Sequence, residues 1–184
     1  SELFRDISLD DELIDYIECR LSRELRNIVL IGMPGSGKSA VCSVLSRRLG
    51  REVIEADAEI ERLAGMTIPE IFASGGEKSF RAIETKVLAE AGKQSGKIIS
   101  TGGGCVTVPE NYPLLHQNGV IVRIKRDIAA LPTDGRPISQ SSDMAELAKK
   151  REPMYRRFAD FEVSNDGAIG DTVDEIVEKL LTEY

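Results

Sequence analysis

A glycine-rich segment at residues 32–39 (GMPGSGKS) constrains the fold of this chain more than any other feature. It follows an apolar run at 27–31 (NIVLI) and precedes a stretch, 40–49, whose apolar residues recur at helical spacing. A strand, a glycine loop and a helix in this order form a phosphate-binding loop, in which backbone N–H groups and the helix N-terminus face phosphate oxygens. The pattern predicts a nucleotide site within an α/β domain.

The side chains of this segment suit the same chemistry. The Lys38 ammonium can reach the β- and γ-phosphates, and the Ser39 hydroxyl can bind Mg²⁺. The alternative, an ordinary glycine turn that opens a helix, is disfavoured because the sequences on both sides fit the motif. The residues expected to hold the nucleotide are Gly35, Ser36, Gly37, Lys38, Ser39 and Ala40.

The remaining sequence predicts a three-layer α/β/α fold, in which helices cover both faces of a five-stranded parallel sheet. Apolar runs alternate with helical patterns, so strands are expected at 27–31, 52–56, 97–101, 119–124 and 160–163. Helix starts are marked by T-x-x-E or D-x-x-E sequences at Thr67, Asp143 and Thr172, and by Pro109. Residues 129–142 lack periodicity and contain Pro, Gly and Ser, so a mobile loop is expected there, with a lid at about 132–142.

Residues 1–26 are expected to form an N-terminal extension ahead of a domain at 27–184. Within the extension, residues 9–25 place leucines and isoleucines on one face of an amphipathic helix. Such a stripe gains free energy when it is covered, and packing on the same chain is favoured over a dimer contact or a joint to a fusion partner. The protein is expected to be a monomer.

The composition narrows the partners and the compartment. A net charge of −7 disfavours nucleic acid, and no apolar run approaches the ~20 residues of a membrane span. The cysteines, Cys19, Cys42 and Cys105, are widely spaced without a C-x-x-C pair, which argues against disulfides or zinc and favours the reducing cytoplasm. Cys42 is interpreted as a core residue, Cys105 as a core residue or a reactive thiol, and His116 as a loop or helix-end residue.

Two carboxylates, Glu55 and Asp57, lie at the end of the second expected strand. Ligands of open α/β sheets bind at this edge, where a carboxylate can hold Mg²⁺ through water or accept a proton from a hydroxyl. The alternative is a pair of acids at a helix N-terminus, where Asp57 would be a good cap. The spacing alone leaves both interpretations open.

Four further features could contribute to a site for an anionic ligand. Arg81 and Glu84 share a helix face, either as a surface ion pair or as a buried pair in which Glu84 holds Arg81 rigid. A glycine triplet at 102–104 follows an expected strand and permits close approach of a ligand to the backbone, with a flexible turn as the alternative. Arg136 lies in the expected loop, where an arginine can stabilise a transferring phosphoryl group. Arg151 is either a second anion ligand or a base on a helix surface.

Together these motifs resemble the shikimate kinase family. The matches, in order, are GMPGSGKS, EAD, GMTIPEIF, GEKSFRAIE, GGG, GRP and REPMYRR, and they run from about residue 27 to the C-terminus. The resemblance implies ATP-dependent phosphorylation of the 3-hydroxyl of shikimate, with Mg²⁺, in aromatic amino-acid biosynthesis. It implies three groups of residues: Asp57, Arg81, Gly103 and Arg151 for shikimate; Ser39 and Glu55 for the metal; and Lys38, Asp57 and Arg136 for catalysis.

The sequence departs from the family pattern at three points. Glu55 stands where the family usually has Asp, and residues 1–26 have no counterpart in the smallest members. The stretch from Ile124 to Arg136 is short and lacks the arginine that usually covers adenine. The nearest rival function is a kinase for gluconate or a nucleoside monophosphate, but a two-arginine carboxylate site favours shikimate over a nucleobase. A non-enzymatic sensor is disfavoured by the retained transfer residues, and a GTPase by the absence of N-K-x-D.

Overall fold

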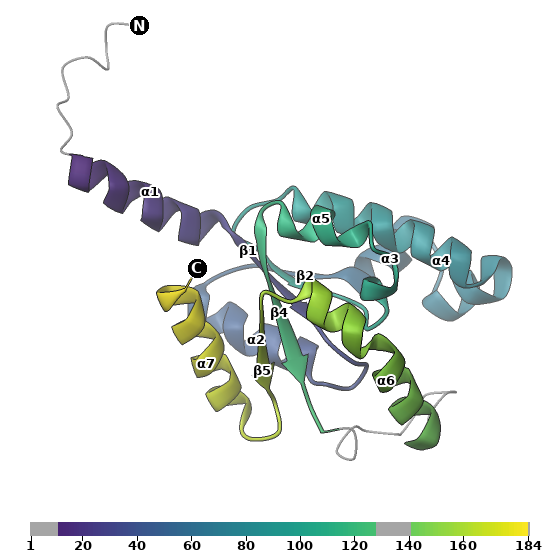
Figure 1. Cartoon of the computed structure of the whole chain (residues 1–184). Helices are drawn as coiled ribbons and strands as arrows, with labels where there is room; N and C mark the ends of the chain where they lie inside the picture. The colour runs from purple at the N-terminus through teal and green to yellow at the C-terminus, as the bar shows by residue number, and fades with distance from the viewer. Residues whose placement is uncertain (1–10, 128–140, 184) are drawn as a thin grey trace, which may run out of the picture.

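Five parallel strands form the central sheet of the molecule (Figure 1). The computed structural model describes residues 11–127 and 141–183. The strands are β1 (Asn27–Ile31), β2 (Val53–Glu55), β3 (Ile98–Ser100), β4 (Gly119–Lys125) and β5 (Phe161–Ser164). They lie in the order β2-β3-β1-β4-β5, and each neighbouring pair is parallel, which confirms the predicted sheet.

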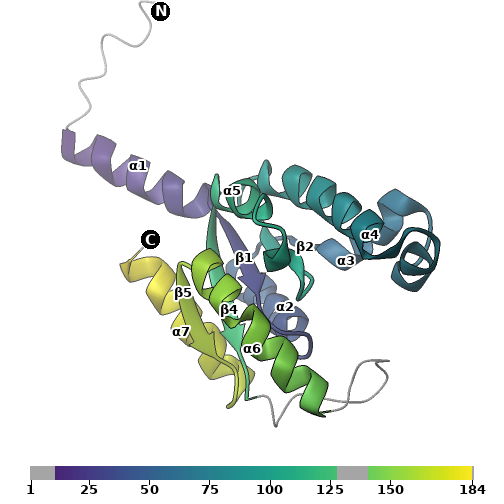
Figure 2. The same ribbon diagram turned by 45° about the vertical axis from the view of Figure 1, so that its right-hand side comes forward.

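Helices cover both faces of this sheet, so the core has two layers (Figures 1 and 2). Helices α2 and α7 pack on the face that carries Ile28 and Leu30 of β1, whereas α4, α5 and α6 pack on the face that carries Val29 and Ile31. Successive strand residues point to opposite faces, which is why residues 28–31 of β1 are all apolar. The helices are α1 (Asp11–Leu25), α2 (Lys38–Leu49), α3 (Ala56–Ala64), α4 (Ile68–Gly92), α5 (Asn111–His116), α6 (Ser141–Phe158) and α7 (Ile169–Thr182), with a 3₁₀ turn, η2 (Cys105–Thr107), after β3.

The predicted helix starts had mixed outcomes. Thr67 and Glu70 form the capping box that opens α4, as predicted. The prediction at Thr172 is wrong, because α7 begins at Ile169 and the Thr172 hydroxyl donates to the Ser164 carbonyl oxygen at 3.1 Å. Asp143 does not open a helix either, since α6 already begins at Ser141. Pro109 precedes α5 by two residues rather than lying in its first turn.

Helix α1 projects away from the body of the molecule (Figure 1). Four apolar residues of its stripe are 39–51% exposed, so the expectation that the stripe packs on the same chain is wrong: they are Leu13, Ile17, Leu21 and Leu25. Ile14, the remaining isoleucine of the stripe, is half-buried. The C-terminal end of the helix is nevertheless anchored. The Arg51 guanidinium donates to the carbonyl oxygens of Arg23 at 2.9 Å and Arg26 at 2.8 Å, and the Gly96 N–H donates to that of Leu25 at 2.7 Å. These bonds satisfy carbonyls that the end of a helix leaves without partners.

Candidate active site

The glycine loop at 32–39 joins the carboxyl end of β1 to the first turn of α2. Gly37 is the N-cap residue of α2 with φ +92°, and a Cβ there would lie 2.3 Å from Asn165 Nδ2, so a side chain is excluded. The buried Lys38 ammonium donates to the carbonyl oxygens of Gly32 at 2.9 Å and Met33 at 3.0 Å. The lysine therefore lies across the loop, where the motif places it for contact with phosphate.

A buried asparagine supports this loop from the neighbouring end of β5. Asn165 Nδ2 donates to the Ser36 carbonyl oxygen at 2.8 Å. The Thr172 hydroxyl shares its proton between the Ser164 carbonyl oxygen and Asn165 Oδ1, the latter at 3.0 Å, and so supports the orientation of the amide. Sequence reasoning missed Asn165. The signal that could have found it is an asparagine directly after a strand, at the sheet edge where ligands bind.

One cleft collects residues from the carboxyl ends of four strands. Its lining brings together most of the predicted nucleotide and metal residues with Asp57 and the first two glycines of the triplet: Pro34, Gly35, Gly37, Lys38, Ser39, Ala40, Glu55, Asp57, Ser100, Thr101, Gly102, Gly103 and Arg126. Ser36, the remaining predicted loop residue, is fully buried and does not line the cleft. Arg126, one residue after β4, was not predicted, although a base directly after a strand is a signal of the same kind.

The two predicted carboxylates occupy different positions at this edge. Glu55 is both the last residue of β2 and the N-cap residue of α3, whereas Asp57 lies in the first turn of that helix. Asp57 is therefore not the cap. A Cβ at Gly102 would lie 3.0 Å from Asp57 Oδ1, so this carboxylate faces the glycine triplet.

Arg81 and Glu84 form the buried pair rather than the surface pair. Arg81 Nη1 donates to Glu84 Oε2 at 2.7 Å, and the Glu84 side chain is fully buried. Burial raises the pKa of Glu84, although the Arg81 guanidinium opposes this shift. A Cβ at Gly104 would lie 2.1 Å from Arg81 Nη2, so the guanidinium packs directly on the triplet. Glu84 thus holds Arg81 at the glycine backbone, as one of the two sequence interpretations required.

The middle glycine of the triplet is held from two sides. A Cβ at Gly103 would lie 2.6 Å from Cδ of Pro34 in the phosphate-binding loop. From α6, the Tyr155 hydroxyl donates to the Gly103 carbonyl oxygen at 2.5 Å, and Arg151 Nη1 donates to the same oxygen at 3.2 Å. Arg151 was predicted at this site, whereas Tyr155 was not.

Three other candidate residues, Cys42, Cys105 and His116, do not line the cleft. Arg136 lies outside the described residues. Burial raises the pKa of the Cys105 thiol to about 12, so a reactive thiol at this position is wrong. Cys42 is buried in the core, and His116 is the last residue of α5, with Nε2 3.1 Å from Asp160 Oδ1. No helix in the described part of the chain is long and apolar enough to cross a membrane.

A parallel sheet in this strand order, with a phosphate-binding loop after β1 and an arginine–carboxylate cluster beside it, defines a P-loop kinase for a small acidic molecule. The family model for shikimate kinase matches residues 34–181. A shikimate kinase from Caldicellulosiruptor bescii is 38% identical over 151 residues, which are 77% of this chain and 87% of that protein. The structure of shikimate kinase from Acinetobacter baumannii in complex with shikimate has a TM-score of 0.80 and 35% identity, and covers 89% of this chain and 97% of that one.

The chain belongs to the shikimate kinase family, and it is an enzyme with shikimate kinase activity. A gluconokinase from Sinorhizobium meliloti shares the fold with a TM-score of 0.61, but it is only 17% identical over 86% of this chain and 93% of its own. That likeness extends to the architecture alone.

Proposed function

We propose that this chain transfers the γ-phosphoryl group of ATP to the 3-hydroxyl of shikimate, giving shikimate 3-phosphate and ADP. The arrangement around the glycine triplet carries the proposal. Arg81 packs on Gly104, Asp57 faces Gly102, and Gly103 adjoins the phosphate-binding loop. An acceptor with a carboxylate at one end and hydroxyls at the other therefore finds a partner for each end within reach of the nucleotide.

On the acceptor side, we assign the shikimate carboxylate to Arg81 and Arg151. A guanidinium binds a carboxylate through two parallel N–H···O bonds, which gives both strength and orientation. Asp57 accepts hydrogen bonds from the ring hydroxyls, and Gly103 lets the ring approach the backbone. Glu84 keeps Arg81 in place from within the core.

On the nucleotide side, the loop N–H groups and Lys38 bind the phosphates. Ser39 and Glu55 line the same cleft, and their oxygens suit Mg²⁺, which keeps several water and phosphate ligands of its own. Among the described residues no three His, Cys, Asp or Glu side chains converge on one point, which agrees with a metal held largely by water and phosphate oxygens. Bound there, Mg²⁺ would neutralise charge on the phosphates. Arg136, which lies in the segment that the structure does not describe, would stabilise charge on the transferring phosphoryl group.

The proposed step is an in-line displacement. The 3-hydroxyl oxygen bonds to the γ-phosphorus, the bond from that phosphorus to the bridging oxygen of ADP breaks, and the hydroxyl proton passes to Asp57. Because the transition state is loose, the protein contributes mainly by positioning the reactants and by placing positive charge near the equatorial oxygens of the γ-phosphoryl group. Lys38 and the loop supply that charge, while Arg81 and Arg151 hold the acceptor still. We place this reaction in the cytoplasm and expect a monomer to perform it.

The test is an ADP-release assay with shikimate, gluconate and nucleoside monophosphates as separate acceptors. We expect turnover with shikimate alone. Arg81→Ala should raise the KM for shikimate far more than the KM for ATP, and Arg81→Lys should not restore it, because an ammonium lacks the planar fork. Equal effects on both substrates would remove Arg81 from the carboxylate site, and turnover with gluconate in place of shikimate would overturn the assigned acceptor.

A further inference from the structure

An arginine is buried within the apolar strand β4. Arg123 is 6% exposed and lies on the same sheet face as Ile121, the face that α6 covers. Its guanidinium binds both oxygens of Glu152 on α6, with Nη1 to Oε1 at 3.1 Å and Nη2 to Oε2. Nη1 also donates to Oε1 of Glu162 on β5 at 2.5 Å. Arg123 thus joins the helix to the sheet through a two-bond contact.

The same guanidinium lies 5.0 Å from the ring centroid of Tyr155, one turn further along α6. This is a cation–π contact, in which the guanidinium packs against the fully buried ring. Burial raises the pKa of Tyr155, so its hydroxyl remains a donor at physiological pH. That hydroxyl holds the Gly103 carbonyl oxygen at 2.5 Å. A continuous set of contacts therefore runs from Arg123 through Glu152 and Tyr155 to the glycine triplet.

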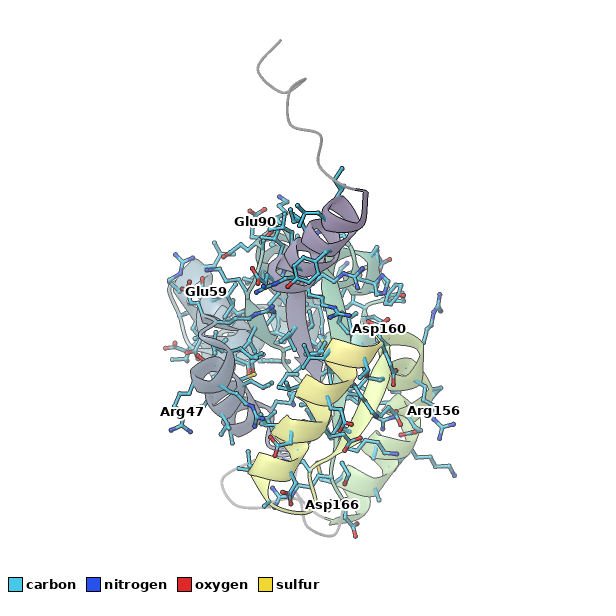
Figure 3. All side chains as sticks on the ribbon, turned by 90° about the vertical axis from the view of Figure 1, so that its left-hand side faces the viewer. Arg47, Glu59, Glu90, Arg156, Asp160 and Asp166 are labelled. Carbon is cyan, nitrogen blue, oxygen red and sulfur yellow. The ribbon has the colours of Figure 1, made fainter. Side chains whose placement is uncertain are left out.

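Helix α6 needs such an external contact at this turn. Pro153 lies inside the helix and cannot donate the backbone hydrogen bond that an α-helix makes there. The turn that carries Arg151 and Glu152 consequently has one internal bond fewer. The neighbouring Arg156, which also donates to Glu152 at 2.8 Å, is 70% exposed and extends outward from α6 (Figure 3), so Arg123 is the partner that links Glu152 to the sheet.

We propose that Arg123 is a positioning residue for the carboxylate side of the shikimate site. It fixes α6 through Glu152 and Tyr155, and α6 in turn holds Arg151 and Gly103 where the substrate binds. The proposal rests on the assignment of Arg151 and Gly103 to shikimate. A buried ion pair contributes little to stability compared with apolar residues of the same volume, so a purely structural role would not require this charge.

The test compares three variants around one guanidinium. Arg123→Met and Glu152→Gln break the connection to α6, and we expect each to raise the KM for shikimate about tenfold while the KM for ATP changes by less than about twofold. Glu162→Gln is the matched control, because it removes the other carboxylate of Arg123 and leaves α6 attached. It should lower Tm without changing the KM for shikimate. If all three variants lower Tm alike and leave this KM unchanged, the role is merely structural and the proposal is wrong.

A fourth variant, Tyr155→Phe, tests the proposal even if Arg123→Met does not fold. Tyr155→Phe keeps the ring beneath Arg123 and removes only the hydroxyl that binds Gly103, so it should retain Tm near that of the wild type and still raise the KM for shikimate. An unchanged KM for shikimate in Tyr155→Phe overturns the proposal.

Arg151→Ala distinguishes a failure of the carboxylate assignment from a failure of the positioning role. A raised KM there with unaffected Arg123 and Tyr155 variants defeats the positioning role alone, whereas an unchanged KM in Arg151→Ala defeats the carboxylate assignment and the positioning role with it.

Discussion

At the scale of single residues, we propose that Asp57 and Lys38 act in different parts of the transfer. We expect Asp57→Asn to leave ATP binding nearly intact and to abolish turnover, because the amide keeps the size of the carboxylate but cannot take the hydroxyl proton. Lys38→Ala should lower kcat by on the order of a hundredfold, since the ammonium acts on charge that develops in the transition state. Calorimetric titration with a nucleotide analogue and steady-state rates separate these effects. An active Asp57→Asn enzyme would exclude Asp57 as the base.

We expect Asn165 to affect nucleotide binding from outside the cleft, because it supports the phosphate-binding loop. Its amide holds the Ser36 carbonyl, so Asn165→Ala should loosen the phosphate-binding loop and raise the KM for ATP about fivefold, the equivalent of a hydrogen bond worth ~1 kcal/mol. The KM for shikimate should not change, because the triplet keeps its own contacts. Thr182→Ala is the control, since it removes a hydroxyl from an exposed position of α7, the helix that supports Asn165. Equal increases in both KM values would indicate a general loss of structure.

At the scale of elements, the attachment of α6 to β4 depends on the ionisation of Glu152. The hydrogen bond from Arg123 lowers the pKa of Glu152 from 4.5 to about 2. A carboxylate whose pKa is lowered by folding stabilises the native state fully above its unfolded pKa, and this contribution disappears as the pH falls through the folded value. The difference in free energy of unfolding between wild type and Glu152→Gln should therefore be constant above about pH 5 and shrink toward pH 2. Urea unfolding at several pH values measures it, and a difference that grows on acidification would contradict the ion pair.

The helices and strands also show which features of this fold can be predicted from the sequence and which cannot. Each strand was found within about two residues because a parallel strand buried on both faces must be an apolar run. The prediction of a helix start at Thr172 was wrong because T-x-x-E is a local pattern. In the structure the Thr172 hydroxyl instead bonds to Ser164 of β5 and to Asn165. Arg123 is visible in the sequence as the charged residue within the apolar run GVIVRI, but its partners lie 29 and 39 residues away and depend on how α6 packs. The contacts of Tyr155 with Gly103, 52 residues apart, were beyond reach for the same reason.

At the scale of the whole molecule, α1 and the active site lie at opposite edges of the sheet. The phosphate-binding loop follows the carboxyl end of β1, whereas α1 precedes its amino end (Figures 1 and 2). The anchoring bonds from Arg51 and Gly96 reach only the last turn of α1. The direction of the helix is thus fixed at its base while most of its apolar stripe stays exposed, and no residue of α1 lines the cleft in the described part of the chain.

This separation predicts that deletion of residues 1–24 leaves the KM values for shikimate and ATP within about twofold of those of the full chain. Thermal stability should fall only slightly, because the exposed stripe contributes little buried apolar area and Arg51 keeps the Arg26 carbonyl as a partner. Steady-state kinetics, thermal unfolding and sedimentation of both proteins measure the three quantities. A larger mass for the full chain that disappears on truncation would identify the stripe as an interface between copies of the chain. A folded truncation that no longer binds shikimate would show that α1 supports the site across the sheet, and it would contradict the separation argued from the topology.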